Sequence, residues 1–264
     1  MKIKHYLYNT FIIESDNKKL VIDPGVELYI LAFLKNILPK SEWKNTTHIF
    51  VTHGDPDHYW NTDRLALETG ATIICNKTML SEQNGDKFLL APRKKGLSFT
   101  TKVNNVHSIT QDQKIIVDDM NITGIKSVHG PLGIKFGPFS KVEKPGPKER
   151  IGWGAIGFKI ELNGKTVVNM GDTIFLDNEW QNISNPDLLM VPIGGRFVNN
   201  TMDEKQALKT VEIIKPKQVV PCHYNCRAFF SKNYNYADDI GFKKNVEKMG
   251  IKCDIMELGD EIII

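Results

Sequence analysis

Four of the seven histidines in this sequence could bind a metal, because each follows a predicted strand in a loop that also contains Gly, Pro or Asp. Three aspartates stand in these or similar loops. Neutral imidazole and carboxylate supply the nitrogen and oxygen ligands that Zn, Fe and Mn prefer. The candidate metal ligands are therefore His53, Asp55, Asp57, His58, His129, Asp172 and His223.

The densest group of candidates is the segment His-Gly-Asp-Pro-Asp-His, which begins at His53. Four ligands from so short a segment would be strained on one ion, and two adjacent ions relieve that strain. His53 and Asp55 would then hold one ion. Asp57 and His58 would hold the second ion, and Asp172 would bridge the pair.

His129 and His223 come from distant predicted strands, and each would complete the ligand set of one ion. Such a pair of ions suits hydrolysis, because a metal lowers the pKa of bound water from 15.7 to about 7 and polarises the oxygen where charge develops. The resulting hydroxide would attack an ester, a lactone or a phosphoester. Asp57 is a candidate proton acceptor as well as a ligand.

Short strands must position most of these residues. The apolar runs predict strands over residues 11–13, 20–22, 48–52, 71–75, 115–117, 122–128, 155–162, 166–170, 188–191 and 218–220. Helices are predicted over 27–38, 60–69 and 201–214, and the last begins at Thr201-Met202-Asp203-Glu204, which matches a capping box.

The segment 130–152 differs in composition, with four prolines and five basic residues. It predicts a long basic loop inserted in the chain. Loops of this length in compact domains are usually functional or disordered. Two interpretations stay open, a flap that covers a substrate and a solvated insertion without a role.

The ordered set of candidates resembles the metallo-β-lactamase superfamily, in which a strand is followed by His-x-His-x-Asp-His, then by a later His, an Asp in a Gly-Asp pair and a last His. The resemblance covers nearly the whole chain, including Asp23-Pro24-Gly25 and the Pro-Ile-Gly-Gly segment at 192–195. The sequence is most similar to small metal-dependent hydrolases related to L-ascorbate-6-phosphate lactonase and N-acylphosphatidylethanolamine phospholipase D. The resemblance implies one domain over 1–264 with an α+β fold, a four-layered αββα sandwich of two mixed β-sheets with helices outside and metals at one edge.

Asp55 departs from that pattern, because the superfamily usually has His there. Either the Asp-Pro-Asp segment is only turn chemistry, or the carboxylate is a ligand. As a ligand it would make a cluster of two divalent ions, three carboxylates and one hydroxide formally neutral, which favours Mn or Fe beside Zn. The flavodiiron proteins similarly carry a carboxylate at this place. A degenerate metal-binding protein without hydrolase activity and a diiron redox protein are the alternatives to a hydrolase.

Composition bounds the partners. With 41% hydrophobic and 25% charged residues the chain can form a globular core, and a net charge of +3 does not indicate a nucleic-acid binder. No apolar run reaches the roughly 20 residues of a membrane span, and four cysteines in 264 residues are no disulfide framework. We expect a cytoplasmic protein with no nucleic-acid or membrane partner. A homo-oligomer is compatible with the sequence, which does not set the oligomeric state.

The expected substrate is a small molecule. Arg196, the basic residues at 93–95 and those of segment 130–152 could bind a phosphate or carboxylate group of an anionic substrate. The alternative is that these charges are only solvated faces.

Overall fold

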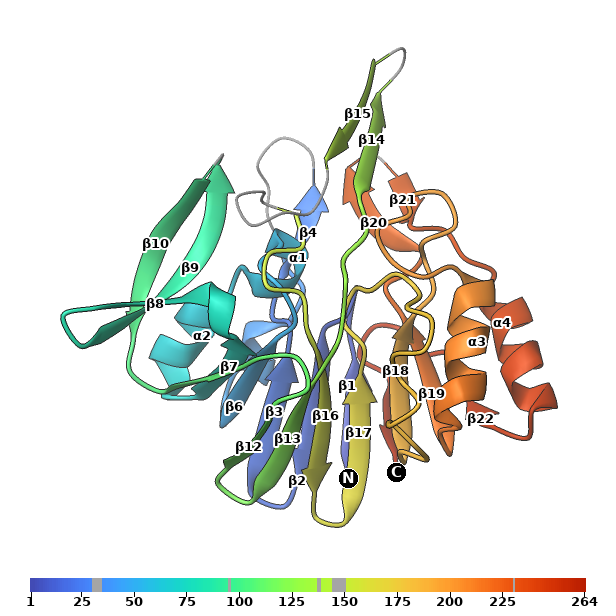
Figure 1. Cartoon of the computed structure of the whole chain (residues 1–264), viewed down its shortest axis with the longest axis horizontal. Helices are drawn as coiled ribbons and strands as arrows, with labels where there is room; N and C mark the ends of the chain where they lie inside the picture. The colour runs from blue at the N-terminus through green and yellow to red at the C-terminus, as the bar shows by residue number, and fades with distance from the viewer. Residues whose placement is uncertain (30–34, 95, 137–138, 144–150, 230) are drawn as a thin grey trace.

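Two mixed β-sheets face each other in the computed structural model, which describes residues 1–264 except 30–34, 95, 137–138, 144–150 and 230 (Figure 1). The first sheet has the order β11 (Val106–Ile109), β7 (Thr72–Asn76), β6 (His48–Val51), β3 (Lys18–Ile22), β2 (Phe11–Ser15), β1 (Lys2–His5) and β23 (Glu261–Ile263). The second has the order β12 (Lys114–Val117), β13 (Met120–Ile125), β16 (Gly157–Leu162), β17 (Lys165–Asn169), β18 (Leu188–Pro192), β19 (Gln218–Cys222) and β22 (Lys252–Cys253).

The main core fills the space between the two sheets. Alternate residues of β2 point to opposite faces, so Phe11 and Ile13 enter this core while Ile12 packs on the outer side of the first sheet. Phe50 of the first sheet meets Phe158 of the second edge to face, with 5.2 Å between ring centroids. The sheets are therefore joined by apolar packing along their length.

Helices cover the outer faces of both sheets. α2 (Thr62–Thr69) packs its buried Leu65 on the first sheet, after the one-turn helix α1 (Pro56–Tyr59). α3 (Glu204–Ile214) and α4 (Asp239–Lys248) bury Val211 and Phe242 against the second sheet (Figure 1). Two short 3-10 helices, Lys40–Glu42 and Lys77–Met79, complete the helical elements of the described residues. The predicted αββα sandwich is confirmed.

Local signals placed the helix ends well, with one shift. Gly70 ends α2 in the left-handed region, at φ 74°. The predicted position of the capping box of α3 is wrong by two residues. Asp203, and not Thr201, is the N-cap, because its side chain accepts from the backbone of Gln206 while the Gln206 side chain accepts from the Asp203 backbone.

The predicted helix over 27–38 is wrong where the chain is described. Residues Val26–Tyr29 form β4 and Lys35–Asn36 form β5, while 30–34 lie outside the described residues. β4 pairs with β5 and with β20 (Cys226–Phe229), which itself pairs with β21 (Ser231–Tyr234). Pairing with strands distant in sequence outweighed the apolar spacing of this segment.

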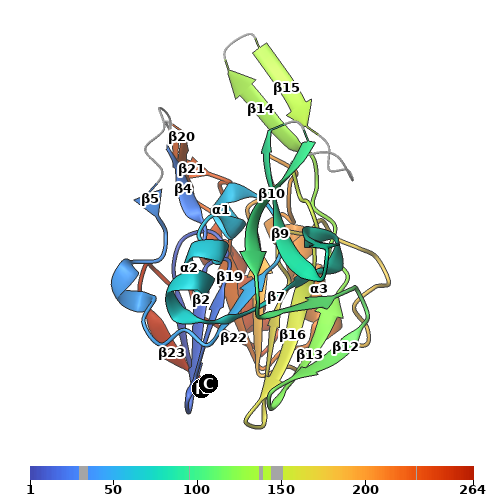
Figure 2. The ribbon, with the colours of Figure 1, turned by 90° about the vertical axis from the view of Figure 1, so that its left-hand side faces the viewer.

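Part of the predicted loop 130–152 is also a strand pair. β14 (Leu132–Phe136) and β15 (Phe139–Glu143) form an antiparallel hairpin, with 137–138 and 144–150 outside the described residues. The prolines of this segment lie outside the two strands, so they do not interrupt the hairpin. β8 (Leu80–Gln83), β9 (Asp86–Lys94) and β10 (Gly96–Val103) form a further antiparallel sheet that the sequence did not predict. The β9–β10 pair and the β14–β15 hairpin project from the same end of the sandwich (Figures 1 and 2).

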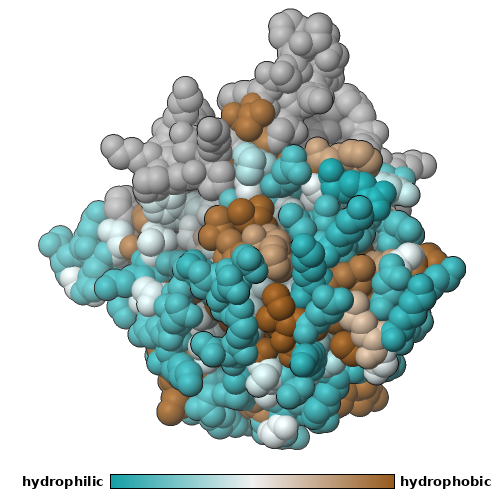
Figure 3. Space-filling view, turned by 45° about the vertical axis from the view of Figure 1, so that its right-hand side comes forward, coloured by the Kyte–Doolittle hydropathy of each residue, from teal (hydrophilic) through white to brown (hydrophobic). Residues whose placement is uncertain are grey.

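The hydropathy of the outer surface is that of a chain whose apolar residues are mostly in the core. The face drawn in Figure 3 is mostly hydrophilic, with hydrophobic residues in small separate groups. Across the described ranges, every helix is too short or too polar to span a membrane.

Candidate metal centre

All seven predicted ligands meet at one end of the sandwich. They follow the carboxyl ends of β6, β13, β17 and β19, of which the first belongs to one sheet and the others to the facing sheet. β13, β17 and β19 run in the same direction, so the loops after them reach the same edge. The seven side chains are all buried.

His53, Asp55 and His129 form one group, called here the first half-site. Oδ2 of Asp55 lies 3.5 Å from Nε2 of His53 and 3.7 Å from Nε2 of His129. Their ligand atoms lie within 4.8 Å of one another, which is a spacing that one ion can bridge.

Asp57, His58 and His223 form a matching group, the second half-site. Oδ2 of Asp57 lies 3.5 Å from Nε2 of His58 and 3.5 Å from Nε2 of His223. These ligand atoms also lie within 4.8 Å of one another. Each half-site thus offers two imidazoles and one carboxylate.

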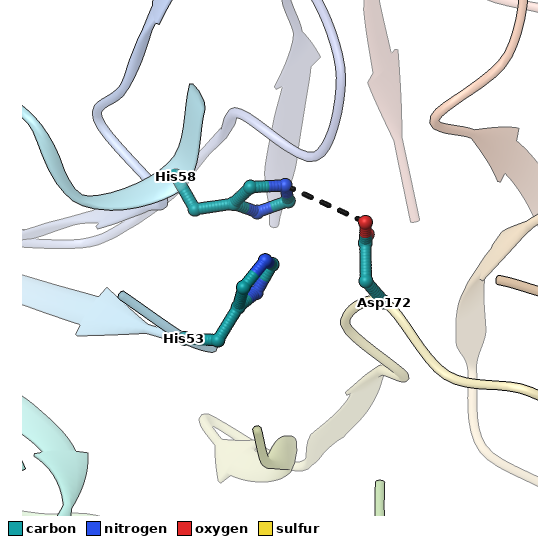
Figure 4. A group of neighbouring side chains, drawn as sticks. All are labelled: His53, His58 and Asp172. Carbon is teal, nitrogen blue, oxygen red and sulfur yellow. Dashed lines mark ion pairs between the residues drawn. The ribbon is translucent and has the colours of Figure 1, made fainter. Parts of the chain in front are cut away.

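Asp172 lies between the half-sites. Its Oδ2 is 3.0 Å from Nε2 of His223, 3.7 Å from Nε2 of His58 and 3.8 Å from Nε2 of His129. Figure 4 shows the carboxylate directed toward the rings of His53 and His58. One carboxylate therefore adjoins both groups.

Several atoms of this centre are buried without a hydrogen-bond partner among the described residues. They are Nε2 of His53, His58 and His223 and Oδ1 of Asp172. A buried polar atom that is left unpaired costs about 1–3 kcal/mol. Bound metal ions would satisfy all four atoms, so the residues present fit the metals that the fold implies.

Asp23 orients two of the imidazoles. Its Oδ2 accepts from Nδ1 of His58 at 2.8 Å and from Oγ1 of Thr52 at 2.6 Å, and Thr52 Oγ1 lies 3.1 Å from Nδ1 of His53. With the Nδ1 protons engaged in this way, both Nε2 atoms are free to bind metal. Sequence reasoning noted Asp23-Pro24-Gly25 only as a hairpin end and in the resemblance. Gly25 permits this segment to lie close to the Asp57 backbone, since a Cβ at residue 25 would lie 1.8 Å from the Asp57 carbonyl oxygen.

The other ligands are held by neutral groups. Nδ1 of His129 donates to the Gly130 carbonyl at 2.6 Å, and the Gly152 N–H donates to Oδ1 of Asp55 at 3.1 Å. The Asn235 amide lies 2.8 Å from Nδ1 of His223, and its oxygen has no other partner in the described chain. Nδ2 is the amide atom nearest the ring, and reversing the amide would place Oδ1 there to accept the Nδ1 proton, which would leave Nε2 free. No sequence signal pointed to Gly152 or Asn235.

The half-sites differ in how they hold protons. Burial lowers the pKa of His223, but the adjacent Asp172 carboxylate outweighs burial and raises it to about 9. Burial also lowers the pKa of His58, but the charges of Asp172 and Asp57 outweigh burial and raise it. Burial dominates at His129 and lowers its pKa. Burial also raises the pKa of Asp57, but His58 and His223 bring it well below its usual range, so this carboxylate is ionised at neutral pH.

Arg196 lies in a loop that connects to both half-sites. Asn200 of this loop accepts from the Gly130 N–H at 2.7 Å, and Gly194 packs against the His223 carbonyl. The Arg196 guanidinium pairs with Glu204 at 2.7 Å and lies over the Tyr236 ring. The other basic residues predicted to bind substrate stand at 93–95 and in segment 130–152, and their side chains, including those of Lys135 and Lys141, lie outside the described residues.

Comparison with known proteins identifies the class. Residues 2–223 match the family model described as a β-lactamase superfamily domain. A metal-dependent hydrolase of the UPF0173 group from Pyrococcus abyssi is 30% identical over 99% of both chains, and one from Carboxydothermus hydrogenoformans is 28% identical over 100% of both. The solved structure of Igni18, a metallo hydrolase from Ignicoccus hospitalis, superposes with a TM-score of 0.70 at 22% identity over 99% of this chain and 97% of that one.

The chain therefore belongs to the β-lactamase superfamily. It is a metal-dependent hydrolase of that superfamily, as the resemblance of its motifs implied.

Proposed function

We propose that the chain is a dinuclear hydrolase of esters, lactones or phosphoesters of small substrates. The observation that supports this most is the set of unpaired, buried Nε2 atoms from both half-sites around one carboxylate. His53, Asp55 and His129 would hold one ion and Asp57, His58 and His223 the other. Asp172 would contact both.

Two divalent ions bound there would supply hydroxide at neutral pH and polarise the carbonyl or phosphoryl oxygen. The residues of the chain would keep the ions close together and exclude bulk water, since all seven ligands are buried. Asp57 is the catalytic residue of the proposal, because its carboxylate is ionised, lies at the centre and is available to accept a proton from the attacking water.

The metals are Zn, Mn or Fe. Three carboxylates among seven ligands make a harder donor set than an all-histidine site, which favours Mn or Fe beside Zn. The Gly152 N–H on Oδ1 of Asp55 leaves Oδ2 directed at both imidazoles of the first half-site, which supports Asp55 as a ligand rather than as turn chemistry. The same donor set is the reason for a second candidate function, a diiron redox protein.

Metal content and hydrolysis test the proposal together. Protein purified without chelator should contain two ions per chain and should hydrolyse at least one member of a panel of lactones, phosphodiesters and thioesters in Mn, Fe or Zn. His58→Ala should lose metal and activity. His107→Ala is the matched control, since His107 is an exposed histidine of β11 outside the centre.

Other results would contradict the proposal. One ion or none per chain, with no hydrolysis, would indicate the degenerate metal-binding protein. Two iron ions with a visible oxo-bridge absorption and no hydrolysis would indicate the redox protein.

An anionic group on the substrate is the second part of the proposal. Arg196 is the candidate to bind it, at a modest gain because Glu204 already shares the guanidinium. Arg196→Ala should raise KM for anionic substrates about threefold to tenfold, roughly 1 kcal/mol, and leave KM for neutral ones unchanged. Lys209→Ala is the control, because Lys209, on α3, lies over the ring of Phe175.

The proposed setting is a reducing compartment such as the cytoplasm. All four cysteines are buried and unpaired, which fits such a compartment.

A further inference from the structure

Two buried asparagines connect the sheets beside the metal centre. Asn9 comes from the turn between β1 and β2 of the first sheet, and Asn169 ends β17 of the second. They are 1% and 0% exposed. Nδ2 of Asn9 donates to Oδ1 of Asn169 at 3.1 Å, and Nδ2 of Asn169 donates to Oδ1 of Asn9 at 2.9 Å. The two amides thus form a reciprocal pair across the sandwich.

Each member of the pair also contacts the support of a proposed ligand. Nδ2 of Asn9 donates at 2.6 Å to Oδ2 of Asp23, which is the oxygen that accepts from His58. Oδ1 of Asn169 accepts at 2.9 Å from the backbone N–H of Gly171, the neighbour of Asp172. A continuous chain of hydrogen bonds therefore runs from His58, in α1 after β6 of the first sheet, to the Asp172 loop after β17 of the second sheet.

A third ligand-bearing loop touches the pair. The Cys222 thiol donates to Oδ1 of Asn9 at 3.5 Å, and the next residue, His223, donates its backbone N–H to the Tyr8 carbonyl at 3.0 Å. Residues 8 and 9 of one turn thus contact the support of His58 and the loop of His223. The second half-site is built around this turn.

Stability alone does not explain two amides at this place. Apolar side chains fill most of the space between the sheets, and a hydrogen bond contributes only about 0.5–1.5 kcal/mol net after desolvation. A hydrogen bond is directional, so it fixes distance and orientation more closely than an apolar contact does. The half-sites need that definition, because Asp172 must reach ligands that are carried by the other sheet.

We propose that Asn9 and Asn169 are positioning residues, which set the separation of His58 and Asp172 and thereby the affinity of the second half-site for its ion. This inference rests on the proposed function, since it requires that two ions bind. It assigns no contact with substrate to either asparagine.

The test is a double-mutant cycle read by metal affinity. Metal-free wild type, Asn9→Ala, Asn169→Ala and the double variant are titrated with Mn²⁺ and with Zn²⁺ at a temperature where all are folded. Each single variant should weaken binding of the second ion about 10- to 100-fold, as loss of a residue that orients a ligand does. The double variant should be little worse than either single one, because either change removes the pair.

Asn163→Gly is the matched control. Its amide also crosses between the sheets, with donations to Ser15 at 2.9 Å and Asp16 at 2.7 Å, but at the far end of the sandwich. Glycine accepts the φ of 52° at this turn. This variant should bind two ions with wild-type affinity, even where its melting temperature falls.

Asn169→Ser keeps the proposal testable if the alanine variants do not fold. A hydroxyl there can still accept the Gly171 N–H but is too short to pair with Asn9, so this change keeps the support of the Asp172 loop and removes the contact between the sheets together with the 3.4 Å contact of Nδ2 with Sδ of Met190. Wild-type affinity for both ions in the folded Asn169 variants would overturn the inference and leave the proposed function intact. Fewer than two ions on the wild-type chain would instead overturn both.

Discussion

The two half-sites have the same donors but different supports. Each offers two imidazoles and one carboxylate and shares Asp172. In the first half-site the Nδ1 atoms meet neutral oxygens, the Thr52 hydroxyl and the Gly130 carbonyl. In the second half-site His58 donates directly to the Asp23 carboxylate, while His223 lies beside the neutral Asn235 amide.

The protonation of the imidazoles also differs, because the Asp172 and Asp57 carboxylates outweigh burial at His58 and His223, whereas burial dominates at His129. The pKa is lowered at His129 in the first half-site and raised at His58 and His223 in the second. A neutral imidazole can take a metal at once, whereas an imidazolium must first lose a proton. Identical ligand types thus give half-sites that should fill under different conditions, and the surrounding groups decide which fills first.

The largest expected effect comes from the residue that the half-sites share. Asp172→Asn removes the charge next to both proposed ions, so we expect metal content to fall from two ions to none and hydrolysis to fall by more than the roughly 100-fold that a supporting residue costs. Elemental analysis and activity measure this. Asp187→Asn is the control, because Asp187 pairs with Lys217 on the surface. Full metal content in Asp172→Asn would show that the half-sites are independent.

The supports should separate the half-sites. Gly152→Ala places a Cβ 2.4 Å from Cβ of His129, so it should weaken only the first half-site, about 10- to 100-fold. Asn235→Gly keeps the φ of 57° but removes the amide beside Nδ1 of His223, so it should weaken only the second. A two-step binding isotherm distinguishes them.

Gly164→Ala controls for backbone strain in this experiment. Gly164 has a φ of 71° but nothing within 4 Å of an added Cβ. Equal weakening of both steps by Gly152→Ala or Asn235→Gly would contradict the separation of the half-sites.

The sequence predicted what local chemistry determines. The strands that lead into the ligands follow from apolar runs, and the four ligand-bearing loops follow from histidines placed after those strands. The sequence could not predict β4, because its partner β20 is distant along the chain, and the composition of segment 130–152 concealed the local hairpin β14–β15. The sequence indicated the seven residues that the fold gathers in the centre, but it missed the roles of Asp23, Gly152 and Asn235, because each acts on a residue that is distant in sequence.

A substitution at Asp55 should shift the preference of the first half-site between Mn and Zn. Asp55→His replaces a hard oxygen by a softer nitrogen and restores the usual pattern of the superfamily, so the ratio of Zn to Mn affinity should rise about tenfold at the first half-site. Competition titrations measure the ratio. Asp55→Asn is the control for shape, because its amide oxygen can still accept from Gly152 while the charge is lost. An unchanged ratio in Asp55→His would mean that Asp55 is turn chemistry.

The pH dependence of metal binding should be the most specific effect. His223, with a pKa raised to about 9 from 6.5, stabilises the metal-free fold below pH 6.5 and loses that contribution as pH rises through 9. An ion entering the second half-site must displace this proton and that of His58, whose pKa is also raised, so its affinity should rise at least tenfold per pH unit between pH 7 and 9. The first half-site, where the pKa of His129 is lowered, should show no such rise. Calorimetry in buffers of different ionisation enthalpy counts the protons released at each step, and equal release at both steps would remove the distinction between the half-sites.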